Sequence, residues 1–156
     1  MTLEGLNDDF RDLIAAFADS GVDFVIVGAY ALAFHGAPRA SGDIDVLVRA
    51  EPDNAVRVVR GLLTFGAPLA AHGIREHDFA QPGKVYQIGL PPRRIDILTE
   101  ISGVTFEEAR ASSISVDVDG HSVCIIGRDS FIKNKLASGR PKDLADVARL
   151  NRTGQP

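Results

Sequence analysis

Three aspartates are placed so that they could act together. Asp43 and Asp45 stand two residues apart in a segment, 43–48, that begins with alternating polar and apolar residues, as a strand does. Because side chains two apart on a strand leave the same face, both carboxylates point the same way. Asp96 lies between apolar neighbours in a second strand-like segment, 94–98. If the sheet brings these two strands together, three carboxylates share one patch.

Carboxylates held this close repel one another, and they stay ionised only beside a positive counter-charge. Hard divalent cations with oxygen ligands are the natural counter-charge, so Asp43, Asp45 and Asp96 predict a Mg²⁺ site, with Mn²⁺ as an alternative ion. The other interpretation is that a carboxylate at the start of a strand is simply solvated. For Asp43 and Asp45 alone the two interpretations are equally good, and Asp96 together with Gly28 favours the metal site.

The elements around the first two aspartates follow from apolar periodicity. Apolar residues recur at three- and four-residue spacings over 6–17, which predicts an amphipathic helix. A short β-branched run at 24–27 is typical of a buried strand, and a glycine separates it from a second helix at 29–34. After the strand at 43–48, a third helix is expected at 53–63.

The second half of the chain predicts a similar mixture of elements. Strands are expected at 85–88, 94–98, 113–118 and 121–126, and helices at 105–111, 131–136 and 144–150. Asp119-Gly120, between the last two strands, is a strong signal for a two-residue hairpin turn. Residues 65–83 show little periodicity, so they hold either a short undetected element or a loop that closes over a ligand. We therefore expect one α/β (α+β) domain, 1–156, with helices packed on a mixed sheet.

The composition fits a single domain of 156 residues, of which 45% are hydrophobic and 24% charged. Seventeen Lys and Arg residues against twenty-one Asp and Glu residues leave a net charge of −4, so no overall basic field indicates a nucleic-acid binder. The single cysteine, Cys124, excludes an intrachain disulfide and a cysteine-based zinc site. No segment resembles a signal peptide or reaches the ~18 apolar residues of a membrane span. We expect a cytoplasmic protein with no membrane partner.

A longer set of motifs resembles a known family. Val27-Gly28-Ala29 opens a predicted helix, and His35-Gly36, Arg39 and Gly42-Asp43-Ile44-Asp45-Val46 follow it in order. This arrangement is similar to the nucleotidyltransferases of the DNA polymerase beta superfamily. Their fingerprint is a Gly followed by Gly or Ser at a strand-to-helix turn, and then an Asp-x-Asp pair on the next strand. The family's third Asp, on a later strand, is matched by Arg94-Ile95-Asp96-Ile97-Leu98.

The tail extends the resemblance. Residues Lys133 to Asp146 are similar to the closing helices of small bacterial members, including AbiEii-type toxins, in which a Lys and an Arg-x-x-Asp stretch return to the active site. The alternative for the basic residues of this tail is a solvated helical face. The resemblance covers residues 22–150, with a nucleotidyltransferase core at about 22–126 and C-terminal helices at about 128–151.

The resemblance implies an enzyme and a role for each matched residue. The reaction is transfer of a nucleoside monophosphate from an NTP such as ATP to an acceptor hydroxyl, with RNA or tRNA, a protein or a small molecule as candidate acceptors. Asp43, Asp45 and Asp96 would be catalytic and would bind the metal. The residues implied in nucleotide binding are Gly28, Ala29, Arg39, Ser41 and Lys135.

Two functional classes stay open. One is the active enzyme, which includes a toxin of a toxin–antitoxin system with a protein antitoxin as its partner. The other is a catalytically weak or inactive module of the same fold that binds nucleotide or a protein partner. Ala29 favours the module because the family usually has Gly or Ser there, whereas the complete set of three aspartates favours the enzyme.

Overall fold

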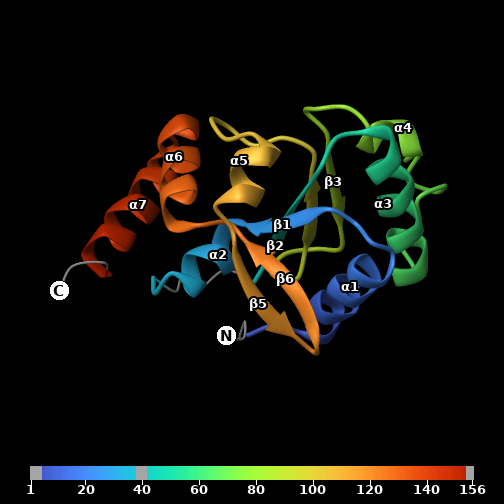
Figure 1. The fold of residues 1–156 in the computed structure, drawn as a ribbon, viewed down its shortest axis with the longest axis horizontal. Helices are drawn as coiled ribbons and strands as arrows, with labels where there is room; N and C mark the ends of the chain where they lie inside the picture. Colours follow the sequence, from blue (N-terminus) through green and yellow to red (C-terminus); the bar gives the residue numbers. More distant parts are fainter. Residues whose placement is uncertain (1–4, 38–41, 154–156) are drawn as a thin grey trace.

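The computed structural model describes residues 5–37 and 42–153, and this part of the chain contains six strands and seven helices around one mixed sheet (Figure 1). The strands are β1 (Phe24–Val27), β2 (Ile44–Val48), β3 (Val85–Ile88), β4 (Ile95–Leu98), β5 (Ile114–Val118) and β6 (His121–Ile125). The helices are α1 (Asp8–Asp19), α2 (Gly28–Phe34), α3 (Pro52–Phe65), α4 (Glu76–Phe79), α5 (Phe106–Ala111), α6 (Arg128–Ser138) and α7 (Pro141–Thr153). The predicted α/β fold class is confirmed.

The sheet order β3-β4-β2-β1-β6-β5 puts the two aspartate strands next to each other. Strand β2 runs parallel to β4 and antiparallel to β1, while β6 runs parallel to β1. In the β2–β4 register Asp45 lies opposite Asp96, and in the β1–β2 register Val27 lies opposite Asp45. The sheet therefore aligns the end of β1 with both aspartates.

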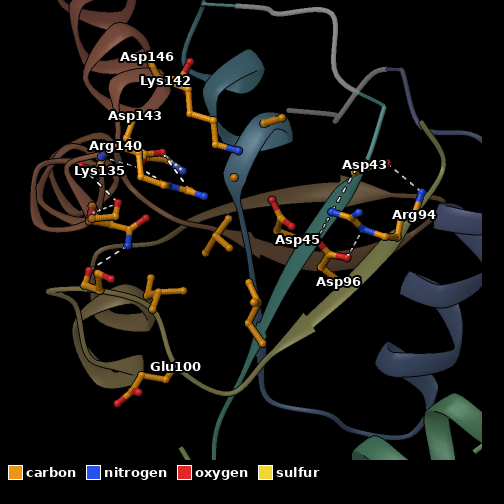
Figure 2. A pocket seen from close by; sticks show the side chains of 18 of the residues that line it. Asp43, Asp45, Arg94, Asp96, Glu100, Lys135, Arg140, Lys142, Asp143 and Asp146 are labelled. Atoms are coloured by element: carbon orange, nitrogen blue, oxygen red, sulfur yellow. Dashed lines mark hydrogen bonds and ion pairs between the residues drawn. The ribbon is translucent and has the colours of Figure 1, made fainter. Parts of the chain in front are cut away.

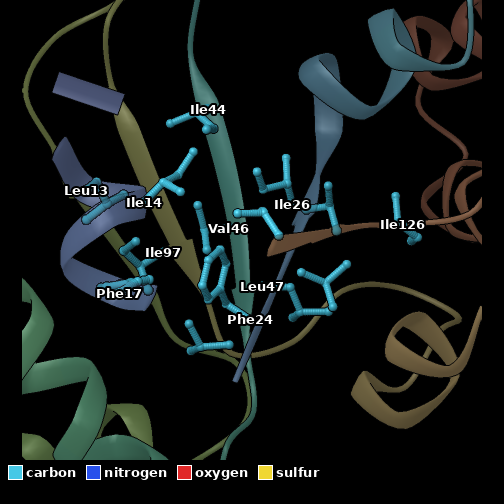
Figure 3. Packing of buried hydrophobic residues seen from close by; sticks show 14 of the residues in the cluster. Leu13, Ile14, Phe17, Phe24, Ile26, Ile44, Val46, Leu47, Ile97 and Ile126 are labelled. Carbon is cyan, nitrogen blue, oxygen red and sulfur yellow. The ribbon is translucent and has the colours of Figure 1, made fainter. Parts of the chain in front are cut away.

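The opposite face of the same strands forms the hydrophobic core. Ile44 and Val46 alternate with the aspartates on β2, and both are fully buried. Figure 3 shows Val46 and Ile97 beside the α1 side chains Leu13 and Phe17. Burying one such aliphatic or aromatic side chain contributes about 1.5–3 kcal/mol. The core thus fixes which face of β2 and β4 carries the carboxylates.

Two groups of helices flank the sheet. In Figure 1, α1, α3 and α4 lie on the right of the sheet, α6 and α7 lie on the left, and α5 lies above β5 and β6. Helix α1 packs against α3, and α3 packs against α4. On the other side α6 packs against α7 and contacts α2. Helices α6 and α7 form the side of the molecule that faces the aspartate strands across a cavity.

The predicted hairpin turn is confirmed by its backbone angles. Asp119 has a φ of 52° and Gly120 a φ of 86°, as expected of a two-residue turn that needs positive φ at both central positions. The turn is joined to α1 by an exposed ion pair, in which Arg11 Nη2 lies 2.8 Å from Asp119 Oδ1. The turn therefore fixes the register of β5 and β6.

Some elements differ from the sequence prediction. The stretch 65–83 holds the one-turn helix α4, which is too short to show apolar periodicity but is anchored by the fully buried Phe79. Helix α6 begins at Arg128, earlier than the predicted Phe131, because its first turn is polar and carries no apolar signal. Helix α7 likewise extends beyond the predicted bounds at both ends. Among residues 5–37 and 42–153, no helix has the length and apolar character needed to cross a membrane.

Candidate active site

A cavity of about 410 Å³ opens between the aspartate strands and the helices α6 and α7. The described residues that line it include Gly28, Ala29, Asp43, Asp45, Gln87, Arg94, Asp96, Asn134, Lys135, Arg140, Lys142, Asp143 and Asp146. Figure 2 shows the aspartates of β2 and β4 on one side and the charged residues of α6 and α7 on the other. The predicted site residues Gly28, Ala29, Asp43, Asp45, Asp96 and Lys135 thus lie around one space. Arg39 and Ser41 lie outside the described residues.

Gly28 is the residue at which β1 turns into α2, and it lies against Asp45. Its φ of 70° is a conformation that glycine adopts without steric cost. A Cβ built at this position would overlap Oδ2 of Asp45. The glycine therefore serves two purposes, because it allows the turn and leaves space for the carboxylate.

Among the three aspartates, Asp45 has the pKa that its surroundings shift most clearly. Burial raises the pKa of Asp45 to about 7, and the charge of the adjacent Asp96 acts in the same direction. The positive charge of Lys135 opposes the shift without cancelling it. A cation bound near these two carboxylates would stabilise their ionised forms and so lower the pKa of Asp45. The pair therefore suits a positively charged ligand.

Arg94 supplies a positive charge to the other two aspartates. Its Nε lies 2.8 Å from Asp96 Oδ1, and its Nη2 lies 3.1 Å from Asp96 Oδ2. The same Nη2 is 3.6 Å from Asp43 Oδ2, and the backbone N–H of Arg94 donates to Asp43 Oδ1 at 3.0 Å. Within residues 5–37 and 42–153, no three His, Cys, Asp or Glu side chains are grouped closely enough to hold a metal ion as they stand. The guanidinium of Arg94 lies between Asp43 and Asp96, where a metal ion shared by the two carboxylates would lie.

The sequence contained a signal for Arg94 that the prediction did not use. Arg94 precedes Asp96 by two residues, so alternation along the strand places both side chains on one face. Asp96 is buried and accepts a bidentate contact from the guanidinium. The hydrogen bond to Asp96 raises the pKa of Arg94 and outweighs burial, which alone would lower that pKa. The contact explains how an acidic residue can be buried at this position.

On the opposite wall, the fully buried carboxylate of Asp143 holds two basic side chains. Arg140 donates to it twice, from Nε to Oδ2 at 2.7 Å and from Nη2 to Oδ1 at 3.2 Å, and Lys135 Nζ lies 3.6 Å from Oδ1. Burial raises the pKa of Asp143, but the hydrogen bond from Arg140 and the charge of Lys135 outweigh it and lower the pKa to about 2. Asp143 therefore stays ionised and holds both basic side chains at the cavity.

Helix α6 is tied to the strand that carries Asp96. The Nδ2 of the buried Asn134 donates to the carbonyl of Ser102, in the loop after β4, at 2.9 Å. Lys135 follows Asn134 directly, and its Nζ also lies 5.4 Å from the centre of the Phe131 ring. By contrast, Lys133 points elsewhere and pairs with Glu108 at 2.7 Å. The alternative of a solvated basic face thus fits Lys133 but not Lys135, whose side chain is 14% exposed.

Comparison with known proteins identifies the fold. No family model matches the chain, and no curated protein matches it. Among solved structures, a putative nucleotidyltransferase from Thermotoga maritima is 12% identical, with a TM-score of 0.57 over 95% of this chain and 96% of that one. An antigenic nucleotidyltransferase-like protein from Paracoccidioides brasiliensis is 13% identical, with a TM-score of 0.52 over 97% of this chain and 79% of that one. The chain has a nucleotidyltransferase-like fold.

Proposed function

We propose that this protein is a Mg²⁺-dependent nucleotidyltransferase that moves a nucleoside monophosphate from an NTP to an acceptor hydroxyl and releases pyrophosphate. The observation that carries the proposal is the pairing of two walls across one cavity. Asp45 and Asp96 lie on the sheet side, and Lys135 and Arg140 lie on the helix side. In a metal-bound triphosphate, the positive metal ion would face the aspartates and the negative phosphates would face Lys135 and Arg140.

The oxygen donors of the three aspartates suit a divalent cation of the Mg²⁺ or Mn²⁺ type by their chemistry, and the carboxylates would have to close around the ion. Asp43, Asp45 and Asp96 offer carboxylate oxygens, which these ions prefer, and Asp45 directly neighbours Asp96 across the sheet. These three aspartates would hold the metal. When bound, it would neutralise phosphate charge and lower the pKa of the acceptor hydroxyl.

The remaining residues bind and orient the substrates. Lys135 and Arg140 would donate charge-assisted hydrogen bonds to the phosphates, which are stronger than neutral ones. Asp143 keeps both side chains directed at the cavity through the contacts described above. Gly28 and Ala29 leave the cavity floor free of large side chains. Asp96, which lies nearer the β3 edge than Asp45, would orient the acceptor and receive its proton.

The biological setting is part of the same proposal. The tail that supplies Lys135, Arg140 and Asp143 is similar to that of small bacterial nucleotidyltransferase toxins, so we propose a cytoplasmic enzyme of this type with a protein antitoxin as partner. ATP is one candidate NTP. RNA or tRNA, a protein and a small molecule are the candidate acceptors.

A second candidate is a module of the same fold without turnover. The contacts of Arg94 with Asp96 and Asp43 favour it, because they occupy carboxylate oxygens that an enzyme needs for metal. Ala29, where similar enzymes have Gly or Ser, also favours it. Such a module would bind nucleotide or a protein partner.

Transfer of label into a cell extract distinguishes the two candidates. The protein is incubated with extract, Mg²⁺ and each of the four NTPs carrying an α-phosphate label. The enzyme should label a macromolecule or small molecule, and Asp45→Asn should abolish the labelling while the exposed control Asp12→Asn retains it. Absence of label with all four NTPs would contradict the enzyme and support the module.

A further inference from the structure

Arg94 contacts two of the three aspartates, through its backbone N–H, its Nε and its Nη2. The guanidinium covers both oxygens of Asp96, at 2.8 and 3.1 Å, and its Nη2 also faces Asp43 Oδ2 at 3.6 Å. Figure 2 shows the guanidinium between Asp43 and Asp96, with Asp45 beside them. Arg94 thus occupies the space beside Asp43 and Asp96 that a cation bound by these carboxylates would have to enter.

A guanidinium and a divalent cation cannot share these oxygens without cost. Both are attracted by the same negative charge, and a bidentate Arg uses one lone-pair direction on each oxygen of the carboxylate. Two cations placed within contact distance of one carboxylate also repel each other. Binding of one therefore weakens binding of the other.

We propose that Arg94 is an internal counter-cation that competes with the divalent cation for Asp96 and Asp43. The inference rests on the proposed metal-dependent function, but it concerns a residue to which that function assigns no role. In the metal-bound form the guanidinium leaves Asp96. Metal affinity is consequently lower than the three carboxylates alone would give, and the metal binds best when nucleotide phosphates supply further ligands.

The position of Arg94 allows this exchange. Its side chain is 28% exposed, whereas the side chain of Asp96 is 10% exposed, so the arginine covers the aspartate from the solvent side. Strand β4 is separated from the sheet edge only by the short strand β3. Because Arg94 precedes β4 and its side chain is partly exposed, the guanidinium can turn toward solvent without disturbing the core, while the register of β2 and β4 keeps the carboxylates fixed.

The test compares Mn²⁺ binding by the wild type, Arg94→Met and Arg93→Met, read by the electron paramagnetic resonance signal of free Mn²⁺. Arg93→Met is the matched control, because it removes the same charge from an exposed neighbouring residue that does not line the cavity. We expect Arg94→Met to bind Mn²⁺ at least tenfold more tightly than the wild type, and Arg93→Met to bind as the wild type does. Equal or weaker binding by Arg94→Met would overturn the proposal, since Arg94 would then assist the metal or be irrelevant to it.

A measurement on the wild type covers the case in which Arg94→Met does not fold. The Nε–H of Arg94, hydrogen bonded to Asp96, should give a protected proton–nitrogen NMR signal that saturating Mg²⁺ removes. Persistence of that signal with metal bound would contradict the exchange. If no variant binds Mn²⁺ and Mg²⁺ leaves the signal unchanged, the metal site of the proposed function fails as well. Metal binding of equal strength in all three proteins overturns this inference alone.

Discussion

The carboxylate of Asp45 lies against the Cα of Gly28, in the space that any side chain at position 28 would fill. Gly28 is the first residue of α2 and directly follows strand β1, whose last residue, Val27, lies opposite Asp45 on β2. The absence of a side chain at Gly28 therefore allows both the start of α2 and the position of Asp45 in the cavity. A side chain introduced at position 28 should therefore displace the carboxylate of Asp45.

Gly28→Ala should destabilise the protein more than Gly73→Ala. Gly28 and Gly73 have similar positive φ values, 70° and 67°, so in both variants the backbone conformation costs about 1–2 kcal/mol. A Cβ at Gly73 meets nothing within 4 Å, whereas a Cβ at Gly28 overlaps Asp45, which adds about 1–3 kcal/mol. Urea unfolding of both variants measures the difference. Equal losses of unfolding free energy would show that Asp45 does not lie against Gly28.

Much of the sheet could be predicted because its signals are local. Alternation on β2 correctly placed Ile44 and Val46 in the core, which leaves Asp43 and Asp45 on the other face. The Asp119-Gly120 turn was predicted because a two-residue hairpin restricts its residue types. The pairing of β2 with β4 could not be read from periodicity, because strand order depends on contacts between residues far apart in the chain.

The candidate site was predicted in its acidic half and incompletely in its basic half. Asp43 and Asp45 are two residues apart, so their shared face followed from strand geometry, whereas the approach of Asp96 depended on the pairing of β2 with β4. The pairing of Arg94 with Asp96 and Asp43 was missed, although its spacing from Asp96 was visible. The role of Asp143 as a partner of Lys135 and Arg140 depends on how α7 packs on α6, which no local pattern reveals.

Lys135→Ala should weaken NTP binding without unfolding the protein. Losing one charge-assisted hydrogen bond to a phosphate costs about 1.5–3 kcal/mol, which raises the Kd roughly 10- to 150-fold. Lys133→Ala is the control on the same helix, because Lys133 is 57% exposed and pairs with Glu108 outside the cavity. Isothermal titration with a non-hydrolysable NTP measures both variants. An unchanged Kd for Lys135→Ala would show that Lys135 does not contact the phosphates and serves only as a partner of Asp143.

Asp143→Asn should make the protein less stable at neutral pH and almost equally stable in acid. The pKa of Asp143 is lowered to about 2, so its ionised form stabilises the fold above about pH 4. That contribution disappears as the pH falls through the folded-state pKa. A shift of this size corresponds to about 2.5 kcal/mol.

Chemical denaturation of wild type and Asp143→Asn at several pH values between 2 and 7 checks this expectation. The difference in unfolding free energy should be largest above pH 5 and should shrink below pH 4. A difference that stays constant over this range would mean that Asp143 is not held ionised by Arg140 and Lys135.

The most direct test of the proposed function separates nucleotide binding from transfer at Asp96. Asp96 is assigned to the acceptor side, so Asp96→Asn should keep much of the Mg·NTP binding through Asp43 and Asp45 yet lower transfer by orders of magnitude. Pyrophosphate release is measured with cell extract as the source of acceptor, at matched nucleotide occupancy, with Asp12→Asn as the control. We predict release by wild type and Asp12→Asn and almost none by Asp96→Asn. Equal release by wild type and Asp96→Asn would contradict the catalytic role of Asp96, and release by none of them with any of the four NTPs would contradict the enzyme itself.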